Sequence, residues 1–339
     1  MITEIHLRDF RIHRDTLLEG LGPLVAIVGP NASGKTNLLR AVSQAGEYVK
    51  TGKVTPSFPK GATVEIAVAS DHKPNGFVLS SNSAQLPPIA ELARVPNRFL
   101  RLDGDQIGAV SIMLETPPRM AEDGWGLASC ISYLLTTNRT MVDDLLHTAL
   151  QIIPALRGAP EPQVPRVKLR EAADGRAVAE IRRNGFRNLP GGVSSLAVND
   201  TIGADQLWLA GRPADQASEG TLICLAILTE LIMTEGTVLI DDIDHGLHPA
   251  AQRALITALR QLVGQKPNAQ VIMTTHSPYI IDQLEPEEVW VFQPDAEGYT
   301  SAKRLSDHPD AERALEVLTT GEFWSAEGET WVADPVPHG

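Results

Sequence analysis

The chain has 339 residues, 43% hydrophobic and 21% charged, which is enough for one large domain with a sizeable core. A formal net charge of −13 argues against a generic basic coat for nucleic acid, although a local basic face remains compatible with it. The two cysteines, Cys130 and Cys224, argue against a disulfide framework and for a reducing compartment. MITEIHLRDF at the start has no apolar core of a signal peptide, and the longest apolar run, residues 222–233, is too short to span a bilayer. We therefore expect a soluble cytoplasmic protein with no membrane partner.

Strands and helices alternate at both ends of the chain. In the first part we expect strands at 2–8, 24–29, 62–69, 76–80 and 98–102, with a helix at 35–50. In the middle we expect helices at 124–136 and 140–152 and a hairpin across 165–183. Further on we expect helices at 218–234, 249–264, 277–284 and 309–319, and strands at 237–241, 270–275, 288–293 and 298–304. This order predicts a parallel sheet with helices on its faces.

The phosphate loop is the strongest motif. Residues 29–36, GPNASGKT, match G-x-x-x-x-G-K-[ST], follow an apolar strand and open a helix. Glycine torsions place successive backbone N–H groups around a phosphate, and the helix points its positive end at the same anion. Lys35 is expected to reach the β and γ phosphates, and the Thr36 hydroxyl to bind Mg²⁺. We expect nucleotide contacts from Gly29, Pro30, Asn31, Ala32, Ser33, Gly34, Lys35, Thr36 and Asn37.

A pair of aspartates follows the strand in GTVLIDDIDHGLHP. In a P-loop protein Mg²⁺ needs a second acidic anchor at a strand end, and Asp241 has that position, directly or through water. Asp242 is then placed to orient or deprotonate the water that attacks the γ-phosphate. We expect the metal to be Mg²⁺ carrying a nucleoside triphosphate. A separate transition-metal site at Asp244 and His245 and a plain turn are the weaker alternatives.

Two more polar segments surround this strand. ASEGTL, residues 217–222, opens a helix, and Ser218 is either an anion contact or a plain N-cap. VIMTTHSP, residues 271–278, is a buried strand that ends in Thr274, Thr275 and His276. His276 is either a contact of the γ-phosphate or a structural histidine. The basic segment 166–187 is either a solvated hairpin or a nucleic-acid contact.

Taken in order, GPNASGKT, SEGTL, VLIDDIDHGLHP and VIMTTHSP resemble the motifs of the RecF, SMC and OLD-like ATPases. These share the ABC-type ATPase head and are often described as AAA-family ATPases of the AAA-15/21 type. IHLRDFR resembles their first strand, and residues 98–109, 123–129 and 321–332 resemble further segments of some members. The resemblance implies an α/β P-loop NTPase with a mostly parallel core sheet, an antiparallel β lobe and a helical lobe. It implies one domain over 1–339, with a nucleotide-binding core (1–50 and 200–305), a lobe insertion (51–199) and a C-terminal helix and tail (306–339).

Such heads dimerise with ATP sandwiched between them, so the resemblance implies a homodimer. Ser218, Glu219 and Gly220 of one subunit would then meet the γ-phosphate bound by the other. The resemblance also makes Asp241 the Walker B residue and His276 the switch histidine. It suggests Arg11 as a nucleotide contact and Gln106 as the Q-loop residue that senses Mg²⁺. The cofactors implied are ATP and Mg²⁺.

Two positions depart from the family pattern. The residue after the Walker B aspartate is usually Glu, and here it is Asp242, whose side chain is one methylene shorter. A displacement of about 1 Å at a catalytic group can cost roughly a hundredfold in rate, so we expect slow hydrolysis. The signature has Ser-Glu-Gly rather than Ser-Gly-Gly, which is a mild change. OLD-family nucleases add a second metal-dependent domain, and the short stretch after His276 leads us to expect no nuclease activity in this chain.

Several functions fit these motifs. The first is an ATP-hydrolysing, dimerising head that drives or licenses an effector protein, a nuclease or toxin on a separate chain, in DNA repair or antiviral (phage) defence. The second is an ATP-bound switch with marginal hydrolysis that restrains or recruits such an effector. The third is the nucleotide-binding subunit of a transporter, and the fourth is a P-loop kinase. Both agree less well with the signature segment at 217–222 and with the strand that ends at His276. Nucleic acid remains a conceivable further partner.

Overall fold

A computed structural model describes most of the chain. The described residues are 1–68, 75–80, 84–85, 97–112, 115–153, 156, 162–164, 166–168 and 203–333. They divide into two compact units, and each is considered by itself. The first unit takes its residues from 1–99, 234–245 and 252–339, and the second from 100–233 and 246–251. Among the described residues, none of the helices has the length and hydropathy that crossing a membrane requires.

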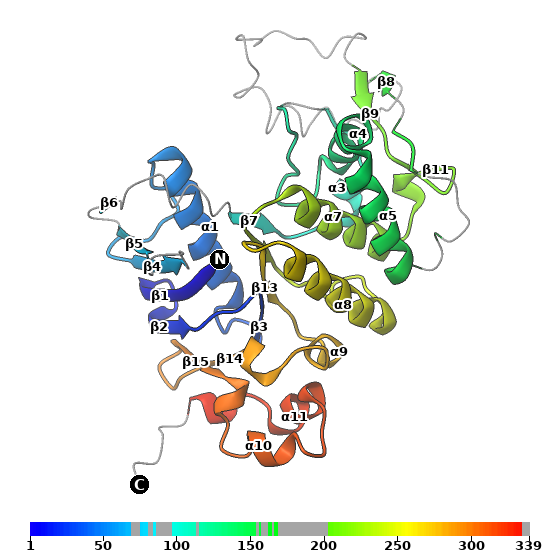
Figure 1. The fold of residues 1–339 in the computed structure, drawn as a ribbon. Helices are drawn as coiled ribbons and strands as arrows, with labels where there is room; N and C mark the ends of the chain where they lie inside the picture. The colour runs from blue at the N-terminus through cyan, green and yellow to red at the C-terminus, as the bar shows by residue number, and fades with distance from the viewer. Residues whose placement is uncertain are drawn as a thin grey trace. The chain divides into compact units, whose positions relative to one another are not determined.

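A six-stranded, mostly parallel sheet forms the core of the first unit (Figure 1). Its order is β15-β14-β3-β13-β12-β7. The strands β3, β13, β12 and β14 run parallel, and β15 is antiparallel to β14. Side chains in the three central strands are buried on both faces, as continuous apolar runs predict. The bounds are β3 (Leu24–Val28), β7 (Asn97–Leu100), β12 (Thr237–Ile240), β13 (Gln270–Thr274), β14 (Val289–Pro294) and β15 (Thr300–Arg304).

An antiparallel sheet of five strands completes the first unit, in the order β2-β1-β4-β5-β6. Its strands are β1 (Ile2–Phe10), β2 (His13–Glu19), β4 (Thr63–Val68), β5 (Asn75–Ser80) and β6 (Ala84–Gln85). Helix α1 (Lys35–Thr51) shares one hydrophobic core with β1 and β4 and also touches β12 and β13. The sequence did not predict β2, which pairs with β1 through a tight turn in which Phe10 faces His13.

Two helices follow strands of the core sheet. α8 (Pro249–Gln265) begins at Pro249, the first helical position, as predicted. α9 (Pro278–Ile281) follows β13 and is shorter than the predicted 277–284. α1 ends at Gly52, whose left-handed φ of +66° lets its N–H reach Tyr48 O.

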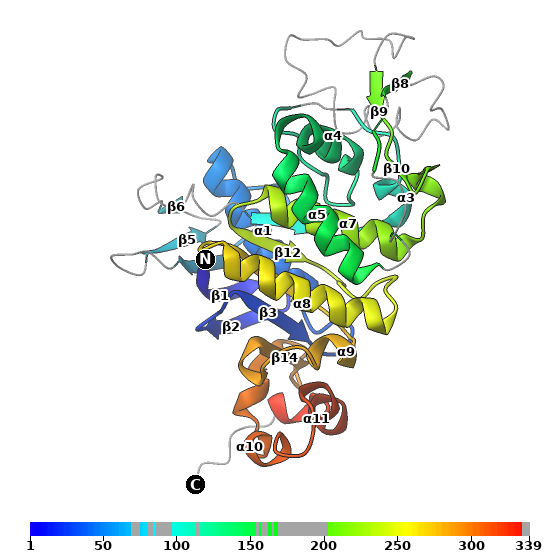
Figure 2. The same cartoon turned by 45° about the vertical axis from the view of Figure 1, so that its right-hand side comes forward.

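The second unit is mainly helical. It contains α3 (Gly104–Ile107), α4 (Leu127–Thr137), α5 (Arg139–Ile152) and α7 (Glu219–Met233). α7 contacts the other three helices and is buried along most of its length. Figure 2 shows α4, α5 and α7 together. Two short antiparallel pairs accompany them, β8 (Arg166–Lys168) with β9 (Gly203–Asp205), and β10 (Trp208–Leu209) with β11 (Arg212–Pro213). Most of the predicted hairpin across 165–183 and of the basic segment 166–187 lies outside the described residues.

The predicted helix at 309–319 is only partly confirmed. The structure has the four-residue helix α10 (Ala311–Ala314) and then a second helix, α11 (Thr320–Glu327). A capping box explains the new start, because Thr319 accepts from Glu322 N while the Glu322 side chain accepts from Thr319 N. This signal was present in the sequence as Thr-x-x-Glu.

Candidate functional site

The phosphate loop connects β3 to α1 as predicted, and its backbone leaves no room for extra side chains. Gly29 has φ +141° and Gly34 has φ +103°, values that favour glycine. A Cβ added to Gly29 would lie 2.1 Å from Phe292 O, and one added to Gly34 would lie 2.5 Å from Thr300 Oγ1. The loop is therefore a bare backbone cradle at the start of a 17-residue helix. Such a cradle fits a phosphate.

A cavity of about 310 Å³ opens at this loop. Apart from Ile12, the residues around it are ones that the sequence predicts for the site, and they come from three separate segments of the chain. Its walls are Ile12, Asn31, Ala32, Ser33, Gly34, Lys35, Thr36, Asn37, Asp242 and His276. Arg11 belongs to the turn between β1 and β2, where it has φ +58°, and its Nη1 donates to Asn37 Oδ1 at 2.7 Å. Arg11 thus contacts a wall residue of the cavity.

Lys35 folds back onto the phosphate loop. Its Nζ donates to Gly29 O at 2.8 Å and to Pro30 O at 2.9 Å. Burial lowers the pKa of the Lys35 ammonium, and the carboxylates of Asp242, Asp241, Glu329 and Asp244 act in the opposite direction. Glu329 in the C-terminal part of the chain is an unexpected contributor to the field at this site.

Asp241 and Thr36 meet although they lie 205 residues apart in the chain. Thr36 Oγ1 is 3.0 Å from both carboxylate oxygens of Asp241. Thr274, at the end of the neighbouring strand, donates from its hydroxyl to Asp241 Oδ1 at 2.9 Å. A hydroxyl and a carboxylate are hard oxygen ligands of the kind that Mg²⁺ prefers, with water completing its shell. These residues therefore fit the group that the sequence predicts, and Asp241 and Thr36 would hold it.

Asp242 lines the cavity in an unusual backbone conformation. It has φ +52°, a region where Asp and Asn are the non-glycine residues most often found, and its N–H donates to Thr274 Oγ1 at 2.8 Å. Partial burial, then repulsion from Asp241 and Asp244, raises the pKa of the Asp242 carboxyl, against the influence of His276 and Lys35. A carboxylate with a raised pKa beside a phosphate cradle is chemically suited to accept a proton from water.

His276 also borders the cavity, with its side chain exposed. The preceding turn is tied to Asp244, because Thr275 Oγ1 donates to Asp244 Oδ1 at 2.7 Å and His276 N to the same oxygen at 3.3 Å. Within the described ranges, no group of three or more His, Cys, Asp or Glu side chains is arranged to hold a metal ion. The Asp244 carboxylate therefore accepts hydrogen bonds from the turn at Thr275 and His276.

The remaining candidate residues belong to the second unit. Ser218 is exposed and precedes α7, where Thr221 N donates to its Oγ at 3.4 Å, as an N-cap would. Gly220 packs closely on the loop after the aspartates, since an added Cβ would lie 2.7 Å from Gly246 O. Gln106 lies in α3, which packs against the start of α7. The close packing is seen at Gly104, the first residue of α3, where an added Cβ would lie 2.8 Å from Glu219 Cγ. Gln106, Ser218, Glu219 and Gly220 thus share one unit.

Three residues with contacts at the site were not predicted to have a role. Thr274 was noted only as a polar strand end, yet it bridges Asp241 and Asp242. His13 and Thr300 hold the phosphate loop from behind, and both lie in strands remote from it in the sequence. The apolar and polar pattern of those strands contains no sign of this contact.

Part of the chain matches a known protein family. Residues 209–282 match the family model described as "AAA domain, putative AbiEii toxin, Type IV TA system". This segment includes the start of α7, the aspartates and His276. It does not include the phosphate loop.

Curated proteins and solved structures are also similar to the chain. An OLD nuclease from Thermus scotoductus (strain ATCC 700910 / SA-01) is 24% identical over 327 residues, covering 83% of this chain and 60% of the relative. The chain thus spans less than two thirds of that protein. An SMC head solved with the C-terminal winged-helix domain of ScpA aligns with a TM-score of 0.56 at 11% identity, over 93% of this chain and 99% of the other. The recombination mediator protein RecF-ATPrS aligns with a TM-score of 0.45 at 14% identity, over 89% and 98%. The fold comparison rests on the SMC head.

Proposed function

We propose that this chain, an AAA/ABC-like ATPase head of the RecF, SMC and OLD class, binds Mg-ATP and hydrolyses it to ADP and phosphate. One observation carries the proposal. Thr36 Oγ1 lies 3.0 Å from both oxygens of Asp241, next to the cavity bounded by the phosphate loop. The oxygen ligands for a hard divalent cation and the cradle for a phosphate thereby adjoin each other.

Each residue of the site has a proposed role. Residues 29–37 bind the triphosphate through backbone N–H groups, and Lys35 adds a point charge. Thr36 and Asp241, with Gln106, hold Mg²⁺, which when bound neutralises the developing phosphate charge. Asp242 accepts a proton from the attacking water, and His276 contacts the transferred phosphoryl group. Arg11 reaches the nucleotide beside Asn37.

We further propose that two heads dimerise around ATP and act on a partner. In this arrangement Ser218, Glu219 and Gly220 complete the site of the opposite head. The partner is an effector protein, a nuclease or toxin on a separate chain, and the setting is DNA repair or phage defence. The names of the relatives support this choice, since one is a nuclease and the matching family model refers to a toxin. A cytoplasmic location suits Cys130 and Cys224, which are both buried and form no disulfide.

A second function has its own support. Asp242 replaces the longer Glu expected at the same position, which favours an ATP-bound switch with slow hydrolysis that restrains or recruits the effector. Both functions share the binding site and differ in turnover.

The decisive experiment is Mg-ATP turnover by the purified chain across a range of protein concentrations. A specific rate that climbs with concentration indicates sites completed by dimerisation. Tight ATP binding with negligible turnover indicates the switch.

Lys35→Ala is expected to abolish ATP binding, because it removes the positive charge that contacts the phosphates. Lys266→Ala is the matched control, since Lys266 is another partly buried lysine whose pKa is lowered by burial, and it is expected to bind as the unaltered chain does. Absence of ATP binding by the unaltered chain would overturn the proposal.

A further inference from the structure

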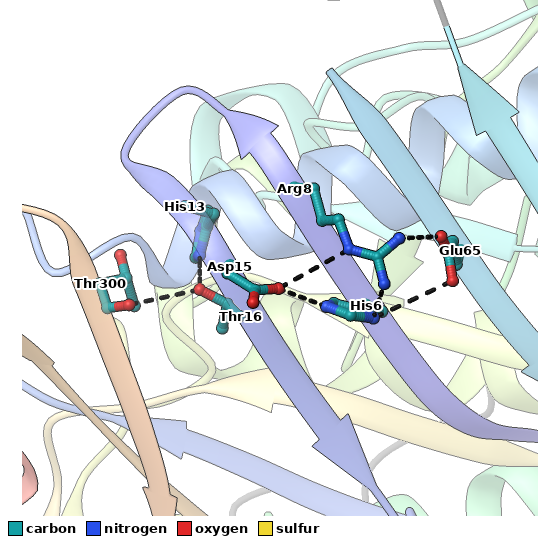
Figure 3. A network of polar contacts seen from close by, with 7 residues as sticks. All are labelled: His6, Arg8, His13, Asp15, Thr16, Glu65 and Thr300. Carbon is teal, nitrogen blue, oxygen red and sulfur yellow. Dashed lines mark hydrogen bonds and ion pairs between the residues drawn. The ribbon is translucent and has the colours of Figure 1, made fainter. Parts of the chain in front are cut away.

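Two buried side chains that are not among the residues lining the cavity donate hydrogen bonds to carbonyl groups of the phosphate loop. Thr300 in β15 donates from Oγ1 to Ser33 O at 2.8 Å, and His13 in β2 donates from Nε2 to Gly34 O at 3.1 Å. His13 is 0% exposed and Thr300 is 6% exposed. Figure 3 shows His13, Thr16 and Thr300 as one set of contacts, separate from the ion pairs of His6, Arg8, Asp15 and Glu65.

The geometry of the peptide group gives these contacts a consequence for the cavity. A trans peptide is planar, and its C=O and N–H point in opposite directions. The carbonyl of Ser33 shares a plane with the N–H of Gly34, and the carbonyl of Gly34 shares a plane with the N–H of Lys35. The Ser33 carbonyl accepts from Thr300, and the Gly34 carbonyl accepts both from His13 and from the backbone N–H of Leu38 at 2.9 Å. Each of these donors restricts the direction of a carbonyl and, through the planar peptide, of the N–H of the next residue. Ser33, Gly34 and Lys35 are all among the residues that line the cavity.

The hydrogen positions in this network follow from its acceptors. Gly34 O can only accept, so the hydrogen of His13 lies on Nε2. Burial lowers the pKa of His13 to about 4, which leaves Nδ1 unprotonated at neutral pH and able to accept from Thr16 Oγ1 at 3.1 Å. Thr16 Oγ1 is also 3.3 Å from Thr300 O, and its single hydrogen can be donated to only one of these two acceptors at a time. The tautomer of His13 is set by the hydrogen bond from Nε2 to Gly34 O.

Gly34 fits these two side chains because it has none of its own. An added Cβ would lie 2.5 Å from Thr300 Oγ1 and 2.9 Å from His13 Cε1. The absence of a side chain at Gly34 therefore leaves the space that His13 and Thr300 occupy next to the loop. The strands β2 and β15 are in this way coupled to the loop, and Thr300 N also donates to Ile12 O at 2.9 Å.

We propose that His13 and Thr300 are positioning residues that orient the peptide groups of Gly34 and Lys35 toward the phosphates of the nucleotide. The inference rests on the proposed function, because it assigns these peptide groups to nucleotide binding. Neither side chain needs to touch the nucleotide. Their effect is on affinity, through the direction of two backbone donors.

The test uses four variants of the full chain and a fluorescent Mg-ATP analogue. Thr300→Val keeps the shape and removes the hydroxyl. His13→Phe keeps a ring against Phe292, which His13 meets edge-on with centroids 6.0 Å apart, and removes the donor. His13→Gln restores an amide N–H. Gln270→Met is the control. Gln270 is buried at the start of β13, at the other end of the strand from Thr274, and its side chain donates hydrogen bonds to the carbonyls of Ile2 and Gly22. Melting temperatures establish that each variant is folded at the temperature of the assay.

We expect Thr300→Val and His13→Phe each to weaken binding about tenfold, the worth of one buried hydrogen bond. His13→Gln is expected to recover part of that loss, and Gln270→Met to lower the melting temperature without weakening binding. Unchanged affinity in folded Thr300→Val and His13→Phe would overturn the inference and leave the proposed function intact. An equal loss in Gln270→Met would also overturn it, by showing a general effect of stability. No binding by the unaltered chain would instead overturn the proposed function and, with it, the inference.

Discussion

Thr274 donates a hydrogen bond from its buried hydroxyl to Asp241 Oδ1 at 2.9 Å, across the neighbouring strands β13 and β12. The hydroxyl oxygen of Thr274 in turn accepts a hydrogen bond from the backbone N–H of Asp242 at 2.8 Å. One side chain therefore sets both the direction of the Asp241 carboxylate and the backbone conformation that presents Asp242. A residue that acts on both aspartates is expected to matter for turnover more than for folding.

Replacing Thr274 by Val removes this bridge at nearly constant volume. We expect turnover at saturating Mg-ATP to fall about tenfold, because small displacements of catalytic groups are costly. Thr237→Val is the matched control, since Thr237 is also buried, starts the neighbouring strand and donates to Gln270 Oε1. Steady-state turnover of both variants checks the prediction, and an equal fall in the two would point to a general loss of stability.

Lengthening the side chain at position 242 tests whether hydrolysis is limited by reach. Asp242→Glu is expected to raise turnover, by up to about a hundredfold. Asp242→Asn, which removes the base, is expected to lower it. The φ of this residue is +52°, a left-handed conformation that Glu adopts less readily than Asp. The melting temperature of each variant should therefore be measured together with its turnover. Turnover that is unchanged or lower in a folded Asp242→Glu variant would contradict the hypothesis.

A bulky cation at the start of α7 tests the assignment of the signature. Ser218 is exposed, so Ser218→Arg is expected to spare the fold and ATP binding while blocking the ATP-dependent dimer. Light scattering with Mg-ATP measures the dimer. Thr140→Arg places the same side chain at another exposed position, early in α5, and is expected to leave the dimer intact. A dimer that survives Ser218→Arg would remove residues 218–220 from the interface.

Acid is expected to destabilise the chain through His13. Burial lowers the pKa of His13 from 6.5 to about 4 in the folded chain, so between these values the unfolded state binds a proton that the folded state does not. The contribution of neutral His13 is therefore complete above pH 6.5 and is lost as pH falls toward 4. Between pH 7.5 and 5 the free energy of unfolding should drop by roughly 2 kcal/mol from this group.

Urea unfolding at the two pH values, in the unaltered chain and in His13→Gln, measures this contribution. The glutamine does not titrate, so the variant should lose less stability between pH 7.5 and 5 than the unaltered chain. Equal losses in the two would contradict the assignment of a depressed pKa to His13.

Much of this fold could be predicted from local pattern. The strands of the core sheet and helices α1, α4, α5, α7 and α8 lie close to their predicted positions. They have strong apolar periodicity and clear start and stop signals, which act over a few residues. β2 was missed because a half-exposed strand with charged residues has a weak pattern, and the C-terminal helix was misplaced because the capping box at Thr319 and Glu322 was overlooked.

The sequence by itself determined the position of the phosphate loop, because GPNASGKT between an apolar strand and a helix specifies a glycine-containing turn through local backbone geometry alone. Only the tertiary structure decided what surrounds that loop. Asp241 reaches Thr36 over 205 residues of chain, and Thr300 reaches Ser33 O over 267. Such contacts depend on strand order and register, which arise when a whole core packs and which periodicity over a few residues does not encode.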